Sequence, residues 1–330
     1  MSYASSVRRG VSAASRLHRD LGTETRIKHE GGRIDVTEAA ASVRLAVLFR
    51  PLDGLLGAFI RAPQPGALVT TKRPLAVQRL TLAHELGHFM LGHDPSLDDE
   101  NILRRAGIPN SGVNDQEVEA DAFAFEFMLP RWLIQFHCRK QGWLLDNLQK
   151  PNVVYQLSLR LGSSYEATCR TLFRHKMIGS DILGQLLAAT PRNLKKELLG
   201  DYAPPDFRGD VWLLTKRDAD SVIDGSHNDL FVLRLEEHSG AGYLWTFKEL
   251  SHLAVVRDLR EQPDHDAIGA NVQRTITTRS EERQRGELVL TEQRPWQPEE
   301  PLHQLAFRYD LMGPEEGMSQ VERRRRLEAA

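Results

Sequence analysis

The segment LTLAHELGHFML, residues 80–91, places two histidines and a glutamate on one predicted helix, as His84, Glu85 and His88. Positions i and i+4 of an α-helix lie one turn apart on the same face, so both imidazoles can reach a single Zn²⁺ at about 2.0–2.1 Å. Glu85 lies beside the histidines, where it can accept a proton from water on the metal. The opposite side of the helix is apolar and is predicted to anchor it in a core, through Leu82, Leu86, Phe89 and Met90.

A third metal ligand is predicted on a second helix, in the segment EVEADAFA at residues 117–124. Glu117 and Asp121 lie one helical turn apart there, next to small alanines that permit close helix packing. Glu117 is predicted to ligate the metal, and Asp121 to hold the free ring nitrogen of a ligating histidine. Glu119 points away from that side of the helix and is the weaker ligand candidate. Two histidines and one glutamate leave a coordination position for water, which is typical of a catalytic zinc site.

His93 is the alternative third ligand. A metzincin site would need a glycine at position 91 and a ligand at position 94, where this chain has Leu91 and Asp94. We therefore interpret His93 as a residue at the C-terminal end of the metal helix, close to the site but outside the set of ligands.

The composition is typical of a folded protein without a membrane-spanning segment. Apolar residues make up 41% and charged residues 27% of the 330 residues, which is too apolar for wholesale disorder. No apolar run approaches the roughly 20 residues needed to cross a bilayer, and the N-terminal stretch lacks the apolar core of a secretory signal. A total of 2 cysteines cannot build a disulfide framework. These observations predict a cytoplasmic protein that does not contact a membrane.

Three regions are expected in a chain of the α+β class. Residues 1–130 are predicted to form a zinc metallopeptidase domain that is mostly helical with a small sheet. Residues 131–200 have helical spacing throughout, broken at Gly162-Ser163-Ser164 as in a helix-turn-helix or a plain helical hairpin, and Ser164 is predicted to cap the second helix. After a Pro-Pro linker, residues 207–320 are predicted to form an antiparallel immunoglobulin-like β-sandwich.

The middle region is basic. Residues 131–200 carry 11 Lys or Arg against 4 Asp or Glu, a net charge of +7, whereas residues 201–330 carry 17 against 25, a net charge of −8. A basic segment of this kind favours weak DNA contact or the docking of an acidic partner, and a solvated helix surface is the alternative.

The sandwich is expected from period-two alternation, which is clearest where Leu305, Phe307, Tyr309 and Leu311 share one face. Further short strands with turn signals between them are predicted at Val211–Leu214, Leu230–Leu235, Gly242–Phe247, Leu253–Val256 and Leu288–Leu290. Short strands at this spacing are typical of a β-sandwich rather than of a helical domain.

The two candidate metal segments, LTLAHELGH at 80–88 and EVEADAFAFEFMLP at 117–130, together resemble the ImmA/IrrE family of metallopeptidases. The second motif of that family has a glutamate, then an alanine, then Asn, Asp or Ser, and then Phe-Ala. Those positions are occupied here by Glu117, Ala120, Asp121, Phe123 and Ala124. The resemblance therefore also selects Glu117 over Glu119 as the ligand.

This resemblance covers residues 34–130, and residues 152–179 resemble more loosely the helix-turn-helix-like region that follows in the family. It implies a gluzincin-like peptidase fold and a cytoplasmic zinc endopeptidase that cleaves a helix-turn-helix transcriptional repressor. Such enzymes often act in the control of phages, mobile elements or the response to DNA damage, a stress response.

The C-terminal third, residues 207–311, carries a second resemblance, to chagasin-type cysteine-protease inhibitors. The segments SGAGYLW at 239–245 and QRPW at 293–296 look like two loop motifs of that immunoglobulin-like fold. The inhibitor pattern has Asn-Pro-Thr-Thr before Gly-Tyr, whereas Gly240 and Ala241 stand in place of the threonines. We therefore expect the fold without inhibition, and a peptide or protein ligand of the two loops, through the recognition residues Tyr243, Trp245, Arg294 and Trp296.

The function predicted from these patterns is a zinc-dependent endopeptidase with Glu85 as the general base and a repressor as substrate. One alternative is a repressor- or DNA-binding regulator with a vestigial metal site. The intact Glu85 argues against it, because a protein that only binds has no need of a general base beside the metal. A second alternative is a cysteine-protease inhibitor acting through the C-terminal domain, which the missing threonines disfavour.

Overall fold

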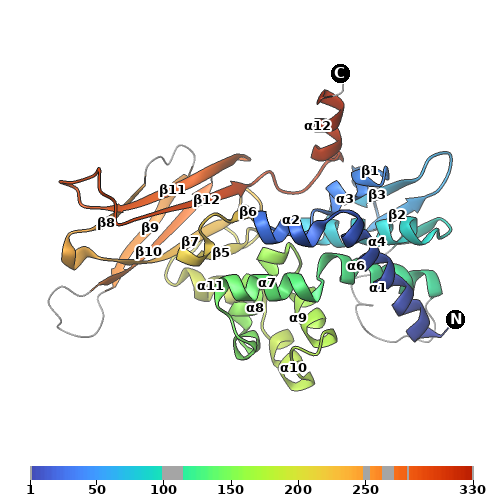
Figure 1. Ribbon diagram of the computed structural model, residues 1–330, viewed down its shortest axis with the longest axis horizontal. Helices are drawn as coiled ribbons and strands as arrows, with labels where there is room; N and C mark the ends of the chain where they lie inside the picture. Colours follow the sequence, from blue (N-terminus) through green and yellow to red (C-terminus); the bar gives the residue numbers. More distant parts are fainter. Residues whose placement is uncertain (1, 99–113, 248–252, 262–270, 281, 329–330) are drawn as a thin grey trace. The chain divides into compact units, whose positions relative to one another are not determined.

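The computed structural model in Figure 1 describes residues 2–98, 114–247, 253–261, 271–280 and 282–328. The chain forms two compact units. The first contains the residues up to Arg139, Trp143–Ala188 and the chain from Pro314 onward, and the second contains Lys140–Gly142 and Ala189–Gly313. Among the described residues, no helix is both long and apolar enough to span a membrane. The predicted α+β class is confirmed, with a largely helical first unit and a second unit built mainly of strands.

The first unit contains one mixed sheet with the strand order β13-β1-β3-β2-β4. Its strands are β1 (Ala46–Arg50), β2 (Gly57–Ile60), β3 (Gly66–Thr70), β4 (Ser96–Asp98) and β13 (Gly317–Met318). β1 and β3 are parallel, and the other neighbouring strands are antiparallel. β2 therefore lies between β3 and β4, so its backbone is hydrogen-bonded on both sides.

The strand β13 comes from the end of the chain, where Met318 lies opposite Leu48 of β1. The backbone N–H of Glu315 donates to Gln78 Oε1 at 3.0 Å, and a basic helix, α12 (Gln320–Glu328), follows β13. The boundary expected from the sequence at residue 320 thus differs from the end of the second unit at Gly313. A strand of two residues has no period-two pattern by which it could be recognised.

The helices described in the first part of the chain are α1 (Tyr3–Asp20), α2 (Thr23–Glu30), α3 (Val36–Ser42), α4 (Leu75–Leu91) and α6 (Asp115–Met128), of which α4 packs against β2 and β3. α4 carries the HExxH sequence and is buried from Gln78 to His88. A Cβ added to Gly87 of α4 would lie 3.1–3.2 Å from atoms of Phe123 and Ala120 on α6. The glycine and alanine therefore let α4 and α6 approach closely enough for their side chains to share one site.

The helix α1 approaches α6 even more closely. A Cβ added to Gly10 would lie 2.2 Å from the backbone oxygen of Glu119 and 2.9 Å from Ala122 Cβ. Neither neighbour is the end of a flexible side chain, so the backbones would have to separate.

The variant Gly10→Ala is expected to lower the free energy of unfolding by about 1–3 kcal/mol, the usual cost of overpacking a core. Gly184 lies in the middle of α10 (Ser180–Ala188), where an added Cβ would meet nothing within 4 Å. Gly184→Ala is the matched control and should stabilise by up to about 1 kcal/mol through helix propensity. Urea denaturation measures both variants. Equal stability of Gly10→Ala and the parent chain would contradict this account of the contact.

His18 of α1 is an unusual core residue. Its ring stacks on Phe127 with centroids 4.6 Å apart and meets the ring of Trp132, in α7 (Arg131–Gln141), edge-on at 5.6 Å. Burial lowers the pKa of His18 from 6.5 to about 4. The folded chain therefore holds this imidazole neutral at a pH where the unfolded chain protonates it.

The unfolded chain takes up this proton below about pH 6.5, and the folded chain only near pH 4, so the free energy of unfolding falls as the pH drops. The expected loss between pH 7.5 and pH 5 is about 2 kcal/mol. His18→Phe, which keeps an aromatic ring at this position, should lose that part of the pH dependence. Urea denaturation of both proteins at the two pH values checks it, and an identical pH dependence would exclude His18 as the cause.

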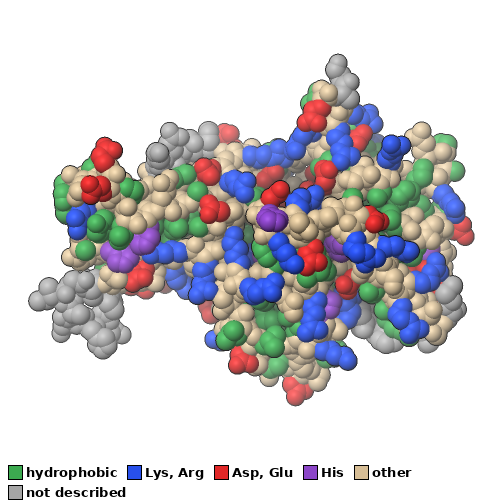
Figure 2. All heavy atoms as spheres, in the orientation of Figure 1, with side chains coloured by type: hydrophobic (Ala, Val, Ile, Leu, Met, Phe, Trp, Pro, Cys, Tyr) green, Lys and Arg blue, Asp and Glu red, His purple; other side chains and the backbone are tan. Residues whose placement is uncertain are grey.

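The middle of the chain is helical, as its spacing predicts. α8 (Pro151–Leu161) ends at Gly162, which has a left-handed φ of 67°, and α9 (Tyr165–Arg174) begins after Ser164. Ser164 Oγ accepts a hydrogen bond from the backbone N–H of Ala167 at 3.2 Å, which confirms the predicted N-cap. The short helix η1 (Leu145–Gln149) precedes α8, and α10 follows α9. Figure 2 shows Lys and Arg side chains spread over the visible face with Asp and Glu between them, rather than in one patch.

The second unit is a β-sandwich of two four-stranded sheets, ordered β5-β7-β10-β9 and β6-β12-β11-β8. A helix, α11 (Pro191–Leu199), and two short helices, η2 (Lys216–Asp218) and η3 (Ser239–Ala241), complete it. The side chains of Leu305, Phe307, Tyr309 and Leu311 are all buried, as the alternation predicts. The strands are β5 (Val211–Leu214), β6 (Val222–Asp224), β7 (Leu230–Glu237), β8 (Leu244–Phe247), β9 (Leu253–Glu261), β10 (Val272–Ser280), β11 (Arg285–Gln293) and β12 (His303–Asp310).

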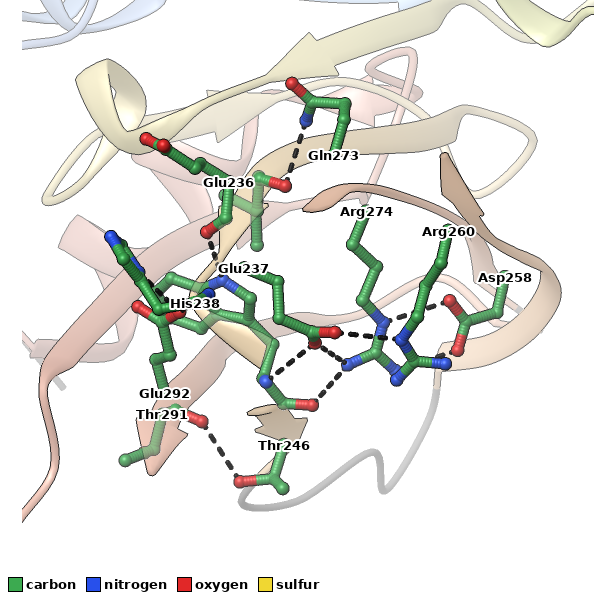
Figure 3. Close-up of polar contacts among 12 residues, drawn as sticks. Glu236, Glu237, His238, Thr246, Asp258, Arg260, Gln273, Arg274, Thr291 and Glu292 are labelled. Carbon is green, nitrogen blue, oxygen red and sulfur yellow. Dashed lines mark hydrogen bonds and ion pairs between the residues drawn. The ribbon is translucent and has the colours of Figure 1, made fainter. Parts of the chain in front are cut away.

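A partly buried ion-pair network crosses the first of these sheets (Figure 3). The guanidinium of Arg274 on β10 donates to both carboxylate oxygens of Asp258 at 2.8–3.0 Å and to Glu237 Oε2 at 2.9 Å. Glu237 also accepts from Arg260 and from the backbone N–H of Trp245. The network therefore fixes the start of β8 against β7 and β10, directly after the loop 238–243.

Candidate functional site

The helices α4 and α6 bring together the three side chains predicted to ligate a metal. The Nε2 atoms of His84 and His88 are 3.0 Å apart. Glu117 Oε2 lies 3.3 Å from His84 Nε2, and Glu117 Oε1 lies 3.5 Å from His88 Nε2. Both histidine side chains are fully buried, whereas that of Glu117 is 16% exposed among the residues that the structure describes.

The donor set and its spacing fit zinc. Bonds of about 2.0–2.1 Å in a tetrahedral arrangement separate neighbouring ligand atoms by about 3.3 Å. The two histidine nitrogens are 3.0 Å apart, and they lie 3.3 and 3.5 Å from two different oxygens of the Glu117 carboxylate, so all three contacts are close to this value. Two imidazole nitrogens and one carboxylate oxygen fill three corners of a tetrahedron and leave the fourth for a water or a substrate.

The other ring nitrogens of the two histidines also have specific neighbours. His84 Nδ1 lies 2.9 Å from Asp121 Oδ1, the contact predicted for Asp121 from the sequence. His88 Nδ1 lies 3.0 Å from His93 Nδ1. A hydrogen on Nδ1 would face these neighbours and leave the lone pair of each ring on Nε2, the atom that faces the other two members of the cluster.

Glu85 is fully buried on α4, and the strand β2 passes directly over it. A Cβ added to Gly57 of β2 would lie 2.3 Å from Glu85 Oε1 and 2.6 Å from Thr81 Cγ2. Only a glycine leaves room for this carboxylate at the sheet. The sequence gives no indication of a role for Gly57, because the loop-like run DGLLGAF shows no strand pattern.

His93 and Glu119, the two residues that the sequence did not select as ligands, contact each other. His93 follows α4 and Glu119 lies on α6, and His93 Nε2 is 3.0 Å from Glu119 Oε2. Glu119 Oε1 is in turn 3.0 Å from Arg9 Nη1 of α1. The sequence carries no signal for Arg9, since it is 110 residues away from Glu119 along the chain.

A second histidine–carboxylate cluster lies in the sandwich. Glu292 of β11 is fully buried and lies 2.9 Å from His238 Nδ1 and 2.7 Å from His303 Nδ1. These are hydrogen-bond lengths and are shorter than the spacing of zinc ligands. Burial alone would raise the pKa of Glu292, but hydrogen bonds from the backbone and ring of His238 and from His303 outweigh it and lower that pKa. The cluster joins β11 and β12 to the loop that starts at His238.

The two loops predicted for recognition lie against each other at this end of the sandwich. The Arg294 guanidinium is 4.4 Å from the centroid of the Tyr243 ring, and Arg294 Nε donates to the backbone oxygen of Ala241 at 3.2 Å. A Cβ on Gly242 would lie 2.5 Å from the Trp296 ring, which is 72% exposed. Trp245 is 2% exposed, so the prediction that it takes part in recognition is wrong: it is a core residue. Tyr243, Arg294 and Trp296 stay predicted recognition residues.

Two family descriptions match the sequence. The IrrE N-terminal-like domain of peptidase family M78 matches residues 46–173, and the chagasin family of peptidase inhibitors, I42, matches residues 226–311. The chain therefore combines an IrrE-like peptidase-family domain with a chagasin-like domain, and both predicted resemblances are confirmed. No curated protein sequence matches it.

Several solved structures are similar to part of the chain. A cysteine protease inhibitor from Entamoeba histolytica, EhICP2, is 21% identical, covers 32% of this chain and 99% of its own, and gives a TM-score of 0.30. Amebosin is 18% identical, with coverages of 30% and 94% and a TM-score of 0.27. PbICP-C, solved in complex with falcipain-2, is 11% identical, with coverages of 33% and 95% and a TM-score of 0.22.

Proposed function

We propose that the chain is a zinc-dependent endopeptidase in which His84, His88 and Glu117 hold the metal and Glu85 is the general base. The observation that carries this proposal is the cluster itself, since α4 and α6 set two imidazoles and one carboxylate at the spacing of tetrahedral zinc ligands. The match to a peptidase family supports it, because residues 46–173 include all four side chains.

Zinc in such a site lowers the pKa of its water and polarises the scissile carbonyl. The residues of the chain do the rest. Asp121 and His93 hold the two imidazole rings at Nδ1, so that the Nε2 atoms are oriented before a metal arrives. A carboxylate oxygen of Glu85 takes the proton from the attacking water and later gives it to the leaving amine. Burial of Glu85 beneath β2 keeps bulk water from competing for this proton.

The substrate proposed is a helix-turn-helix transcriptional repressor, which makes the chain a regulator of transcription. This part of the proposal rests on the resemblance of residues 34–130 to the ImmA/IrrE family and on the IrrE-like family match. Like the peptidases it resembles, the chain is proposed to act in the cytoplasm, in a stress response.

Cleavage of the repressor encoded nearest to this gene tests the proposal. The zinc-loaded chain should produce two defined fragments, identified by mass spectrometry, and a chelator should stop the reaction. A matched reaction with Glu85→Gln excludes a contaminating protease, since that protein would be purified in the same way. Zinc-loaded chain that cleaves neither this repressor nor any protein of the source-cell extract would contradict the peptidase function.

Weak DNA contact through residues 131–200 is a second element of the proposal, supported by the net charge of +7 in that segment. It would bring the peptidase to a repressor bound at its operator. Sequence-specific binding that survives high salt would instead favour the regulator with a vestigial metal site, because binding dominated by phosphate contacts weakens steeply as salt rises.

The chagasin-like domain supports a second candidate function, the binding of a peptide or protein at the paired loops. The exposed ring of Trp296 and the stacked pair of Tyr243 and Arg294 form an aromatic and cationic surface there. We propose that this surface presents substrate to the peptidase or senses a signal, rather than blocks a cysteine protease.

A papain-like protease is expected to retain at least about nine-tenths of its activity in the presence of excess Glu85→Gln chain. Gly240 and Ala241 offer no hydroxyl to a protease active site, and a lost hydrogen-bonding group in such an interface costs about 1–3 kcal/mol. Titration of protease activity measures the effect. A stoichiometric end point would establish the inhibitor function instead.

A further inference from the structure

We propose that Arg9, Glu119 and His93 are positioning residues for the metal ligand His88, which makes the N-terminal helix α1 a working part of the metal centre. This inference rests on the proposed zinc site. The helix α1, Tyr3–Asp20, lies outside the residues 46–173 that match the peptidase family. It nevertheless reaches His88 through three successive contacts of 3.0 Å.

The contact between His93 and His88 results from the way in which α4 ends. Gly92 adopts a left-handed φ of 71°, its N–H donates to the backbone oxygen of Phe89, and the N–H of His93 donates to that of His88 at 3.0 Å. This pair of bonds is a glycine-terminated helix end in which the chain reverses over the last turn. The reversal brings the ring of His93 back onto the ring of His88, with the two Nδ1 atoms 3.0 Å apart.

The direction of the hydrogen bonds follows from the chemistry of each group. A metal at His88 Nε2 needs a lone pair there, so His88 Nδ1 carries the hydrogen and donates to His93 Nδ1. His93 then carries its own hydrogen on Nε2, which lies 3.0 Å from Glu119 Oε2. The Arg9 guanidinium donates to the other oxygen of Glu119. Every donor in the chain of contacts thus meets an acceptor, and both imidazoles are held in the tautomers that suit a metal ligand.

The two ligating histidines are supported in the same manner. His84 contacts the carboxylate of Asp121 directly, and His88 contacts the carboxylate of Glu119 through His93. Both carboxylates come from α6. A carboxylate behind an imidazole orients the ring and makes its ligating nitrogen more basic, and its loss typically weakens metal binding 10–100-fold. Glu119 and His93 are 2% and 5% exposed, so water does not replace them easily.

Arg9 holds the Glu119 carboxylate in place through an ion pair. Its side chain is 45% exposed, while that of Glu119 is 2% exposed, so the ion pair leads from the surface to the interior. The close approach of Gly10 to the backbone of Glu119 fixes α1 at this height on α6. One turn earlier, Ser6 Oγ donates to Asp115 Oδ1 at 2.9 Å, a contact between the same helices that does not lead to the metal.

The test is the zinc dissociation constant of the full-length chain, measured by competition with a chromophoric chelator. Glu119→Gln and His93→Phe should each bind zinc about 10–100-fold more weakly than the parent, and Arg9→Met should weaken binding by a smaller factor. Arg8→Met makes the same change at an exposed neighbouring position of α1, and Asp115→Asn removes the other helix contact. Both controls should bind zinc like the parent.

A second readout separates positioning from folding. With Co²⁺ in place of zinc, the visible absorption spectrum reports the ligand geometry, and it should change in Glu119→Gln and His93→Phe but not in the controls. Arg9→Met lies near the surface, so it tests the same chain of contacts if a core variant fails to fold. Parental zinc affinity and spectrum in the three variants, even with lowered thermal stability, would overturn the inference. A parent chain that binds no zinc would overturn the proposed function as well.

Discussion

Glu85→Gln is expected to bind zinc like the parent chain and to lose peptide cleavage by about 10²–10⁴-fold, the contribution typical of a general base. The amide has the shape of the carboxylate, so it fits beneath Gly57 of β2 without disturbing α4. Glu85 is not a member of the His84, His88 and Glu117 cluster, so no metal ligand is lost. Initial rates of substrate cleavage at saturating zinc measure the effect.

Measuring zinc content and cleavage separately in Glu85→Gln identifies the role of Glu85. A variant with full zinc and no cleavage shows that Glu85 moves a proton, whereas loss of both would show that it holds the site together. Cleavage at the parental rate would exclude Glu85 as the base and would favour a binding function for the whole site.

His84→Ala and Glu117→Ala are expected to lower the zinc content from one ion per chain to about a tenth or less after dialysis. Each variant removes one of the three proposed protein ligands, and the affinity of a zinc site depends on the full donor set. His29→Ala is the matched control, because His29 is exposed on α2. Elemental analysis reads the zinc content. Stoichiometric zinc in both ligand variants would place the metal elsewhere and sink the assignment.

The geometry of the proposed metal cluster could be predicted because it depends on the spacing of residues within two single helices. His84 and His88 are one turn apart on one helix, and Glu117 and Asp121 are one turn apart on another. Helical periodicity alone fixes which side chains share a face. The approach of the two helices could also be inferred, since a glycine on α4 faces an alanine on α6.

The residues that hold the histidines of that cluster in place could not be predicted, because they come from distant parts of the chain. The ion pair of Arg9 with Glu119 joins residues 110 positions apart, and an arginine on a helix is usually a solvated side chain. The site of His93 depends on the left-handed conformation of Gly92, which sequence alone shows only as a helix end. The sequence placed His93 near the site without assigning it a contact, and it gave no indication of a role for Arg9.

The strand β10 could not be predicted from the sequence for a different reason. Its sequence VQRTITTRS has only two aliphatic side chains, Val272 and Ile276, and so lacks the alternation of a half-buried strand. In the structure it is paired on both sides, and Arg274 is buried against Asp258 and Glu237 (Figure 3). The two carboxylates offset the cost of burying the charge of Arg274, and a hydrophobic pattern in the sequence does not reveal such an ion pair.

The origin of β13 at the far end of the chain has a consequence for biosynthesis. Gln78 and Glu315, which hydrogen-bond beside this strand, are 237 residues apart. At a translation rate of about 5–20 residues per second, the ribosome needs roughly 10–50 s to make the chain between them. The sheet beside the metal helix therefore stays without one edge strand until the second unit has been synthesised. A nascent or prematurely terminated chain without Gly317–Met318 would lack this edge strand, so the sheet is completed only after these residues have left the ribosome.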